Sequence, residues 1–297
     1  MQPPQDKRGS VPDPTEDAID MGAPPPCPQL TAGVLNLNKP VGVTSFGVVA
    51  RVRKATHVKR VGHAGTLDPL ASGVLLVCVG QATRIIPYLQ DAPKVYLAGI
   101  RLGQRTTTYD AEGEVTEELV VPERLDLSRF IGEVWQTPPA YSALKREGRP
   151  LYDYARKGEA VDLEPRMVHI ERIDIVDWQA PMASLRVWCG KGTYIRSLAN
   201  DLGGHLVSLV REAVGSFTIE QAIELDQLAA WDNYLMPIEA ALADMPRLSV
   251  DGDGAARLRH GLAVEGPAGE ALAVDPAGNA VAIVREGRPK IVFGAGV

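Results

Sequence analysis

Short runs of apolar residues between glycine and proline turns predict strands along most of this chain. Residues 34–38 alternate large apolar with polar side chains and predict a strand that ends at the Lys39-Pro40 turn. Residues 95–103 predict a second strand, and in 185–189 apolar positions alternate with Arg186 and Trp188. The uninterrupted apolar run 74–79 is typical of a strand that is buried on both faces.

Two helices are predicted close behind such strands. Thr44 and Ser45 are suited to cap a helix whose apolar residues recur at helical spacing, namely Phe46, Val48, Val49 and Val52. The strand 185–189 breaks at Gly190-Lys191-Gly192, after which Ile195, Leu198 and Leu202 mark one face of a second helix. A glycine-punctuated loop, 62–73, precedes the buried strand 74–79, and functional sites are often built on such loops.

The organisation along the chain predicts one large domain with a tail and a small second domain. Residues 1–32 contain eight prolines and almost no large apolar side chains, so we expect a disordered tail. Residues 135–161 are polar and basic without a clean period, which predicts an excursion from the core of a domain spanning 33–246. The short runs 271–274, 281–284 and 291–293, with a turn at 275–279, predict a small β domain over 247–297. Pattern alone therefore favours a mixed α/β or α+β protein.

Composition narrows the class of protein. Of the 297 residues, 45% are hydrophobic and 23% charged, as in an ordinary globular chain, and no apolar run approaches the length of a membrane span. The three cysteines, Cys27, Cys78 and Cys189, are too far apart to suggest a metal site or a disulfide framework, so a reducing cytoplasm is expected. The first residues lack the apolar core of a secretion signal.

The net charge of −6 argues against a polyanionic partner, but the charge is unevenly distributed. Residues 41–67 carry five basic side chains and no acidic one, and 144–157 carry five basic against two acidic. A single run of charged residues of this kind usually forms a solvent-exposed surface with no binding function. Two runs around a glycine-rich loop favour a footprint for a phosphate backbone, with Lys59, Arg60 and Lys145 as candidate contacts.

The loop 62–73 contains His63 and Asp68 and allows four readings: a phosphate loop, a metal site, a catalytic carboxylate or a plain turn. It lacks the Lys-Ser/Thr ending of a nucleotide-binding loop, and one His with one Asp provides too few metal ligands. Asp before Pro is a common turn former, so these residues taken alone favour a turn for Asp68 over catalysis.

The same loop resembles the signature of the TruB family, the tRNA pseudouridine-55 synthases, in which the Asp-Pro loop carries the catalytic aspartate. Further segments resemble this family's motifs in the same order: Leu37 to Ser45, Lys94 to Tyr96, Arg101 to Thr106, Pro139 to Lys145, and Gly192 to Leu198. Because the ordered motifs extend from about Val34 to Phe217, the resemblance is specific.

The resemblance implies an α+β pseudouridine synthase fold, with a mixed, largely antiparallel sheet, flanking helices and a PUA-like C-terminal domain. It implies isomerisation of the T-loop uridine of tRNA without cofactor or metal. Asp68 would be the nucleophile, kept ionised by a bidentate Arg196. Tyr96 would stack on the target base and is a candidate for removing a proton from it. Tyr194 and Leu209 would line the uridine pocket, and His63 would contact RNA by stacking.

Two departures from the family pattern stand out. Val210 replaces one arginine of a common Leu-Arg-Arg run, so a phosphate contact is not expected there, while the chemistry expected of Asp68 is unaffected. A C-terminal domain of about 50 residues is short for a PUA module. We expect a monomer that needs no guide RNA and whose inserted segment, 135–161, closes over the RNA like a thumb. The alternatives are a non-catalytic RNA-binding or RNA-folding protein on the same scaffold, and the catalytic subunit of a guide-RNA-directed enzyme.

Overall fold

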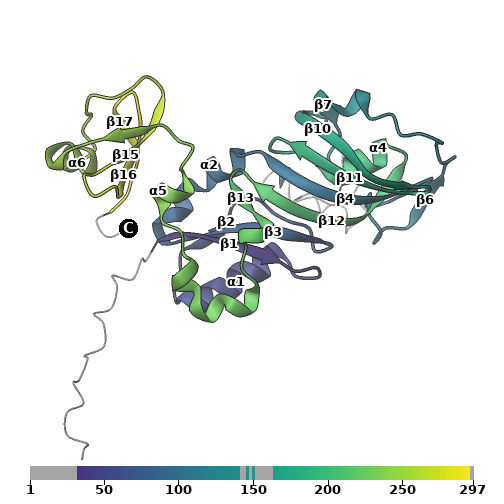
Figure 1. The fold of residues 1–297 in the computed structure, drawn as a ribbon, viewed down its shortest axis with the longest axis horizontal. Coiled ribbons are helices and arrows are strands. Elements are labelled where there is room, and N and C mark those ends of the chain that lie inside the picture. Colours follow the sequence, from purple (N-terminus) through teal and green to yellow (C-terminus); the bar gives the residue numbers. More distant parts are fainter. Residues whose placement is uncertain (1–31, 141–144, 147–148, 151–162, 295–297) are drawn as a thin grey trace, which may run out of the picture.

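The computed structural model describes residues 32–140, 145–146, 149–150 and 163–294. Its centre is a long twisted sheet (Figure 1). Seven strands follow one another in the order β1 (Gly33–Lys39), β3 (Ala71–Val79), β12 (Gly204–Val214), β4 (Lys94–Leu102), β11 (Met182–Cys189), β10 (Arg166–Gln179) and β7 (Gly132–Gln136). Two short strands, β2 (Val61–His63) and β13 (Phe217–Thr218), extend the pairing of β3 and β12. Of these pairings only β3 with β12 is parallel, so the predicted mixed, largely antiparallel sheet is confirmed.

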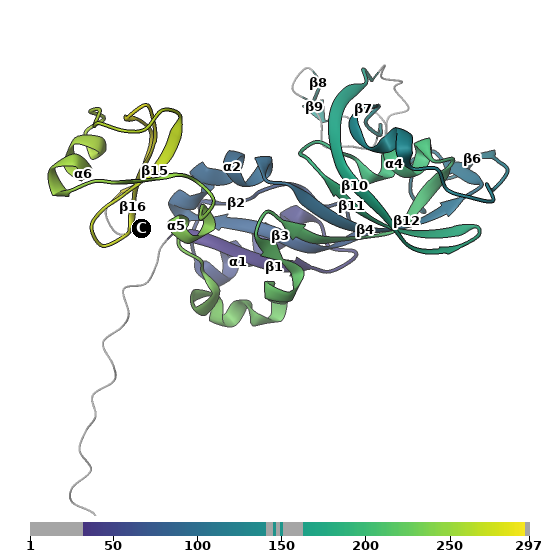
Figure 2. The ribbon, with the colours of Figure 1, turned by 45° about the horizontal axis from the view of Figure 1, so that its top comes forward.

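The remaining elements flank this sheet (Figures 1 and 2). The helical segments of the large domain are α1 (Ser45–Thr56), η1 (Gly80–Ile85), α2 (Ile86–Asp91), η2 (Ser128–Phe130), α4 (Ile195–Asp201), η3 (Ile219–Gln221), η4 (Leu225–Tyr234) and α5 (Ile238–Ala241). Two small hairpins pair β5 (Gln104–Thr106) with β6 (Val115–Glu118), and β8 (Lys145–Arg146) with β9 (Arg149–Pro150). None of the helices in the described ranges is long and apolar enough to cross a membrane.

The first helix forms where the capping pattern predicts it. The Thr44 hydroxyl accepts a hydrogen bond from the Gly47 amide at 3.0 Å, and the helix ends at His57, whose φ of 56° is left-handed. Val48, Val49 and Val52 are buried against the sheet. Phe46 was predicted to belong to the same apolar face, but it points away from the core and is 75% exposed.

The strand, turn and helix unit around residue 190 is also confirmed. In β11 the apolar positions Leu185, Val187 and Cys189 are buried and the polar ones between them are half-buried. Gly192 has a φ of +80°, a conformation that glycine adopts without steric cost, and α4 begins three residues later. This unit packs α4 against β12 and β4, the neighbouring strands near the middle of the strand order.

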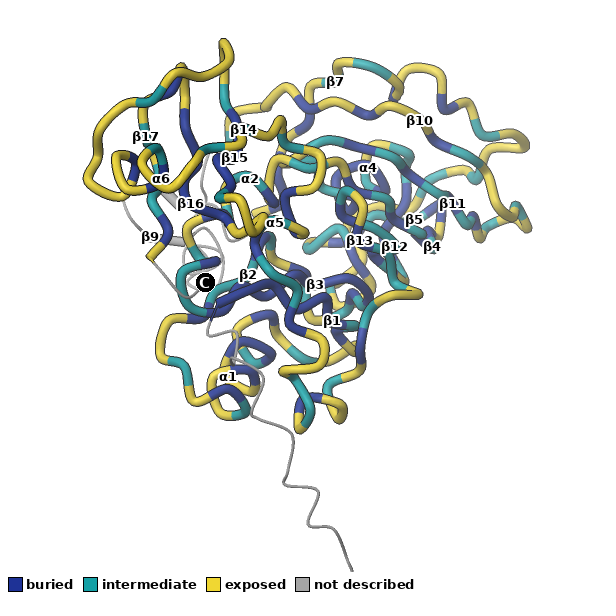
Figure 3. Tube along the Cα trace, turned by 60° about the vertical axis from the view of Figure 1, so that its left-hand side comes forward, coloured by how far each residue is buried: buried dark blue, intermediate teal, exposed yellow. Residues whose placement is uncertain are grey.

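The small C-terminal sheet has the order β14 (Arg247–Ser249), β15 (Glu270–Val274), β16 (Ala280–Arg285) and β17 (Arg288–Val292), with α6 (Gly252–Arg259) beside it. Figure 3 shows its inner strands buried, as are those of the central sheet. Leu272, Ile283 and Phe293 share one apolar core with residues of the central sheet such as Val34 and Cys78. A hydrogen bond of 2.7 Å from the Gly294 amide to the Gln81 side chain also joins the two parts.

The predicted excursion over 135–161 starts later than expected. Trp135 and Gln136 belong to β7, which pairs with β10 at the edge of the central sheet. Residues 141–144, 147–148 and 151–162 lie outside the described part of the chain, as does the predicted tail up to residue 31. The thumb and the tail therefore stay predictions.

Candidate active site

Asp68 lies on a loop that is fastened to the start of α1. The Ser45 hydroxyl accepts a hydrogen bond from the Leu67 amide at 2.9 Å and donates one to the Leu67 carbonyl at 3.1 Å. On the other side of Asp68, the Pro69 carbonyl accepts a hydrogen bond from the Gly42 amide at 2.8 Å. The backbone on both sides of Asp68 is thus fixed, while its side chain stays 34% exposed. A carboxylate held this way is accessible to a ligand and has little freedom to turn away.

Arg196 provides the cation beside this carboxylate. It is the second residue of α4, and its side chain is 5% exposed. Its Nε atom lies 2.9 Å from Oδ2 of Asp68, and its Nη1 atom lies 3.5 Å from Oδ2 of Asp110 and 3.1 Å from the Thr108 carbonyl oxygen. The structure brings Asp68 and Arg196 together as predicted, and Arg196 also contacts a second carboxylate, that of Asp110. The bidentate contact with Asp68 stays a prediction.

Asp110 is the member of this cluster that sequence reasoning missed. It lies in the loop between β5 and β6, and its side chain is 5% exposed. One of its carboxylate oxygens accepts hydrogen bonds from the Glu112 amide, at 3.1 Å, and from the Thr108 hydroxyl. In the sequence Asp110 follows a run of threonines and a tyrosine and resembles an ordinary turn residue, so no local pattern marks it. Its role follows only from the fold, which places it behind Arg196.

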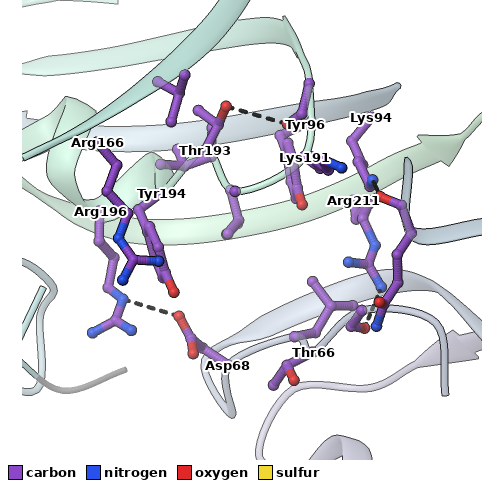
Figure 4. Close-up of a pocket in the computed structure, with 18 of the residues that line it drawn as sticks. Thr66, Asp68, Lys94, Tyr96, Arg166, Lys191, Thr193, Tyr194, Arg196 and Arg211 are labelled. Carbon is purple, nitrogen blue, oxygen red and sulfur yellow. Dashed lines mark hydrogen bonds and ion pairs between the residues drawn. The ribbon is translucent and has the colours of Figure 1, made fainter. Parts of the chain in front are cut away.

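Asp68 and Arg196 line a pocket of ≈ 660 Å³ (Figure 4). Three of the residues predicted to hold the uridine also line it: Tyr96 from β4, Leu209 from β12 and Tyr194 before α4. Tyr96 is 9% exposed, and burial raises the pKa of its phenol. The Tyr194 amide donates a hydrogen bond of 2.7 Å to the Gln136 side chain, which anchors the start of α4 to β7. The pocket therefore combines the Asp68 and Arg196 pair with apolar and aromatic side chains, a combination suited to a planar ring with polar edges.

Arg211 is a second residue that sequence reasoning did not select. Its side chain is 1% exposed, donating hydrogen bonds of 2.6 Å to the Val74 carbonyl and 3.2 Å to the Gly65 carbonyl. Arg211 stands next to Tyr96 in the sheet register and lines the pocket. A Cβ atom on Gly73 would lie 2.3 Å from the Arg211 carbonyl oxygen, so only glycine fits there. Arg211 therefore fixes the backbone of the Asp68 loop at Gly65 and joins it to β3 at Val74.

Three further cations line the pocket, namely Arg166, Lys191 and Lys94 (Figure 4). Lys191 forms an ion pair of 2.8 Å with Asp91, and both side chains are exposed. Lys94 is buried, its ammonium donating to the Ala92 carbonyl at 2.6 Å, and burial lowers its pKa to about 8. Among the described residues, no three His, Cys, Asp or Glu side chains are grouped so that they could hold a metal ion.

The predicted RNA contacts lie outside this pocket. Lys59 and Arg60 are exposed in the turn between α1 and β2. The Lys145 side chain lies outside the described part of the structure. His63 ends β2 and does not line the pocket; its ring meets that of Phe46 edge-on, with centroids 5.9 Å apart. Burial, followed by the nearby charge of Arg211, lowers the pKa of His63 below 6.5.

We expect His63→Gln to make the protein less sensitive to acid. Because the pKa of His63 is lower in the folded protein, the unfolded chain binds more protons below about pH 6.5, and folding stability is lost as the pH falls through the folded value. The free energy of unfolding, measured with urea between pH 7.5 and 5, should therefore decline less in the variant than in the wild type. Parallel curves for both proteins would contradict a buried neutral imidazole.

Comparisons with known proteins identify the family of this chain. The model of the TruB family pseudouridylate synthase N-terminal domain matches residues 53–195. The chain is 44% identical over 253 residues to the tRNA pseudouridine synthase B of Dehalococcoides mccartyi, covering 78% of this chain and 83% of the relative. It is 48% identical over 246 residues to that of Symbiobacterium thermophilum, covering 78% and 82%. A crystal structure of a Cbf5-Nop10-Gar1 complex has a chain with a TM-score of 0.68 and 27% identity, covering 89% of this chain and 84% of that one. The chain therefore belongs to the TruB family of pseudouridylate synthases.

Proposed function

We propose that this protein isomerises the T-loop uridine of tRNA, at position 55, to pseudouridine, with Asp68 as the nucleophile. The observation that carries the proposal is the Asp68 and Arg196 pair at 2.9 Å in a pocket walled by Tyr96, Tyr194 and Leu209. The reaction breaks the bond between the ribose C1′ and the uracil N1, turns the base, and joins C1′ to C5. The C5 proton leaves and N1 gains one, so no oxidant or other reactant is consumed.

The geometry supports a different role for each side chain of the site. Attack by Asp68 on the base at C6 or on the ribose at C1′ requires an ionised carboxylate, and the Arg196 guanidinium places a positive charge 2.9 Å from it. For Tyr96 we propose stacking on the uracil ring. Because burial raises the pKa of its phenol, Tyr96 keeps its proton at neutral pH, which supports packing over proton removal in the unliganded site. The walls keep the detached base in place while it turns.

We further propose that the protein acts on tRNA alone, as a monomer in the cytoplasm. The relatives at 44% and 48% identity are named tRNA pseudouridine synthase B, whereas the titles that name H/ACA particles belong to structures at 26% identity or less. This difference supports the tRNA enzyme over a guide-RNA-directed subunit. A protein that only binds or folds RNA would have no need for the charged cluster of Asp68, Arg196 and Asp110.

The direct test is incubation of the purified protein, with no other component, with an unmodified tRNA transcript. Mapping of pseudouridine should find one new site, at position 55, and a transcript with cytidine at that position should stay unmodified. Binding of the transcript without any pseudouridine would favour the non-catalytic RNA-binding protein. Activity only after addition of a guide RNA would favour the guide-directed subunit.

The exposed basic run predicts strongly salt-dependent tRNA binding despite the net charge of −6. Arg51, Arg53, Lys54, Lys59 and Arg60 are all exposed on α1 and the turn after it. Each phosphate contact releases counterions, so the logarithm of the affinity should fall linearly with the logarithm of the salt concentration. Replacing Lys59 and Arg60 with Ala should make this slope shallower by about 1 to 2. The measurement is the Kd for tRNA across a salt series.

Deletion of residues 1–32 serves as the control, because this acidic segment should contribute no phosphate contact. The deletion is expected to leave both the affinity and the slope unchanged. A slope that is equal in the wild type and in the double variant would mean that Lys59 and Arg60 are only a solvated surface.

A further inference from the structure

An exposed aromatic ring lies next to the Asp68 loop and takes no part in the site described so far. Phe46, in the first turn of α1, is 75% exposed, and Val41, in the turn before the helix, is 64% exposed. The chain has only four phenylalanines, and exposing one costs the free energy that its burial would provide. The Phe46 ring contacts His63 at an interplanar angle of 86°. Apolar side chains so exposed beside a site commonly mark a surface that a partner covers.

The segment that carries these side chains is rigidly attached to the catalytic loop. Lys39, which is fully buried, donates hydrogen bonds to the Pro40 carbonyl at 3.0 Å and the Val43 carbonyl at 2.7 Å, and these fix the turn that presents Val41. Gly42 is bonded to Pro69, and Ser45 holds both backbone groups of Leu67. The residues before and after Asp68 are therefore fastened to the two ends of this exposed segment. A ligand that binds to Phe46 is therefore held at a fixed position relative to Asp68.

The charges around Phe46 identify the kind of partner. Arg53 lies seven residues further along α1, two turns away and on nearly the same side of the helix, and it is exposed. Lys54, Lys59 and Arg60 continue the basic surface. Exposed rings beside a cationic track are how proteins bind single-stranded nucleic acid: bases stack on the rings and phosphates pair with the cations. The neutral His63 suits the same purpose, because an uncharged imidazole stacks on a base without requiring a phosphate.

We propose that Phe46, whose ring meets that of His63 edge-on, forms a stacking platform for an unpaired nucleobase of the RNA loop that neighbours the target uridine. This inference rests on the proposed function and adds a residue that determines how the loop is placed. Moving the target uridine into the pocket takes away a stacking partner from its neighbours and costs a few kcal/mol. A base that stacks on Phe46 regains part of that lost contact. Phe46 thus lowers the cost of opening the loop without touching the reacting atoms.

The test uses the full chain and compares Phe46→Ala with Phe46→Trp. Phe46→Ala should raise KM for the tRNA transcript, and Kd for an isolated T stem-loop, about tenfold, within the range found for stacking side chains. The value of kcat should stay within about threefold, because Phe46 contacts no reacting atom. Phe46→Trp should restore the affinity. Since no charge is removed, the salt slope should remain that of the wild type, unlike in the Lys59 and Arg60 variant.

The matched control is Val115→Ala, which removes another large exposed apolar side chain, on β6 and away from α1, and should change none of these values. An unchanged KM and Kd in Phe46→Ala, or a loss of thermal stability that accounts for the weaker binding, would overturn the platform. So would a tryptophan variant as weak as the alanine variant. If the wild type makes no pseudouridine, the proposed function fails, while the Kd for the stem-loop still decides whether Phe46 binds RNA.

Discussion

Asp68→Asn is expected to abolish pseudouridine formation, lowering kcat by roughly 10⁴-fold or more, while the Kd for tRNA stays within a few fold. The amide keeps the shape of the carboxylate and the fastened loop around it, so the pocket should remain formed. It lacks the negative charge needed to attack carbon. Single-turnover assays with excess enzyme separate this chemical defect from any change in binding.

The control for Asp68→Asn is Asp126→Asn, which neutralises an exposed carboxylate that accepts hydrogen bonds from the Ser128 amide and hydroxyl, outside the pocket. Its kcat should equal that of the wild type. Turnover by Asp68→Asn within tenfold of the wild type would mean that the nucleophile is another group. A large loss of tRNA affinity would instead mean that Asp68 shapes the binding surface.

Arg196→Lys is expected to lower kcat by about 10² to 10³-fold and also to destabilise the fold. A lysine carries the charge as a point at the end of a flexible chain and cannot reach Asp68, Asp110 and the Thr108 carbonyl together. Breaking a buried ion pair commonly costs about 3–5 kcal/mol, because a buried charge is left uncompensated. The measurements are kcat under single turnover and the free energy of unfolding in urea.

Two further variants separate the roles of this arginine. Combining Arg196→Lys with Asp110→Asn removes the carboxylate left without its partner and should recover part of the stability but none of the activity. Arg186→Lys changes an arginine that makes a two-point contact with Glu212 on the sheet surface and should leave kcat unchanged. If Arg196→Lys turns over tRNA at the wild-type rate, the bridge between the two carboxylates has no part in the reaction.

The sequence was informative wherever local chemistry decides the structure. The cap at Thr44, the turn at Gly192 and the buried run of β3 depend on neighbouring residues, and they form as predicted. Ser45, the other predicted cap, is instead the first residue of α1, and its hydroxyl bonds Leu67. Strands β10 and β12 were not predicted, because register shifts interrupt their pairing and break the alternation that would have revealed them. Phe46 was misassigned because its spacing fits the buried face of α1 although its side chain points to solvent.

Some residues of the candidate site could likewise be predicted from the sequence, and others could not. Asp68, Tyr96 and Arg196 were selected by motifs, and the fold brings them to one pocket. Asp110 belongs to none of these motifs, and Arg211 stands in the Leu-Arg-Arg run without having been selected for the site. Their functions depend on partners more than 80 residues away in the chain, as the 88-residue separation of Arg196 and Thr108 illustrates. A long-range hydrogen bond leaves no periodic trace in a single sequence. Buried charged side chains are therefore the part of a site that is hardest to predict without a structure.

The parallel contact between β3 and β12 also has a consequence for the order in which the protein is made. Arg211 supports the Asp68 loop through carbonyl groups 137 and 146 residues earlier in the chain, and β1 bonds to Met236. During synthesis from the N-terminus, the nucleophile therefore emerges long before the residues that hold it. Contacts between residues so far apart in the chain slow folding, because the chain must lose conformational entropy before these contacts form and stabilise the structure. The pocket can be completed only after β12, which ends at Val214, has left the ribosome, so a shorter nascent chain contains Asp68 without the arginine that holds its loop.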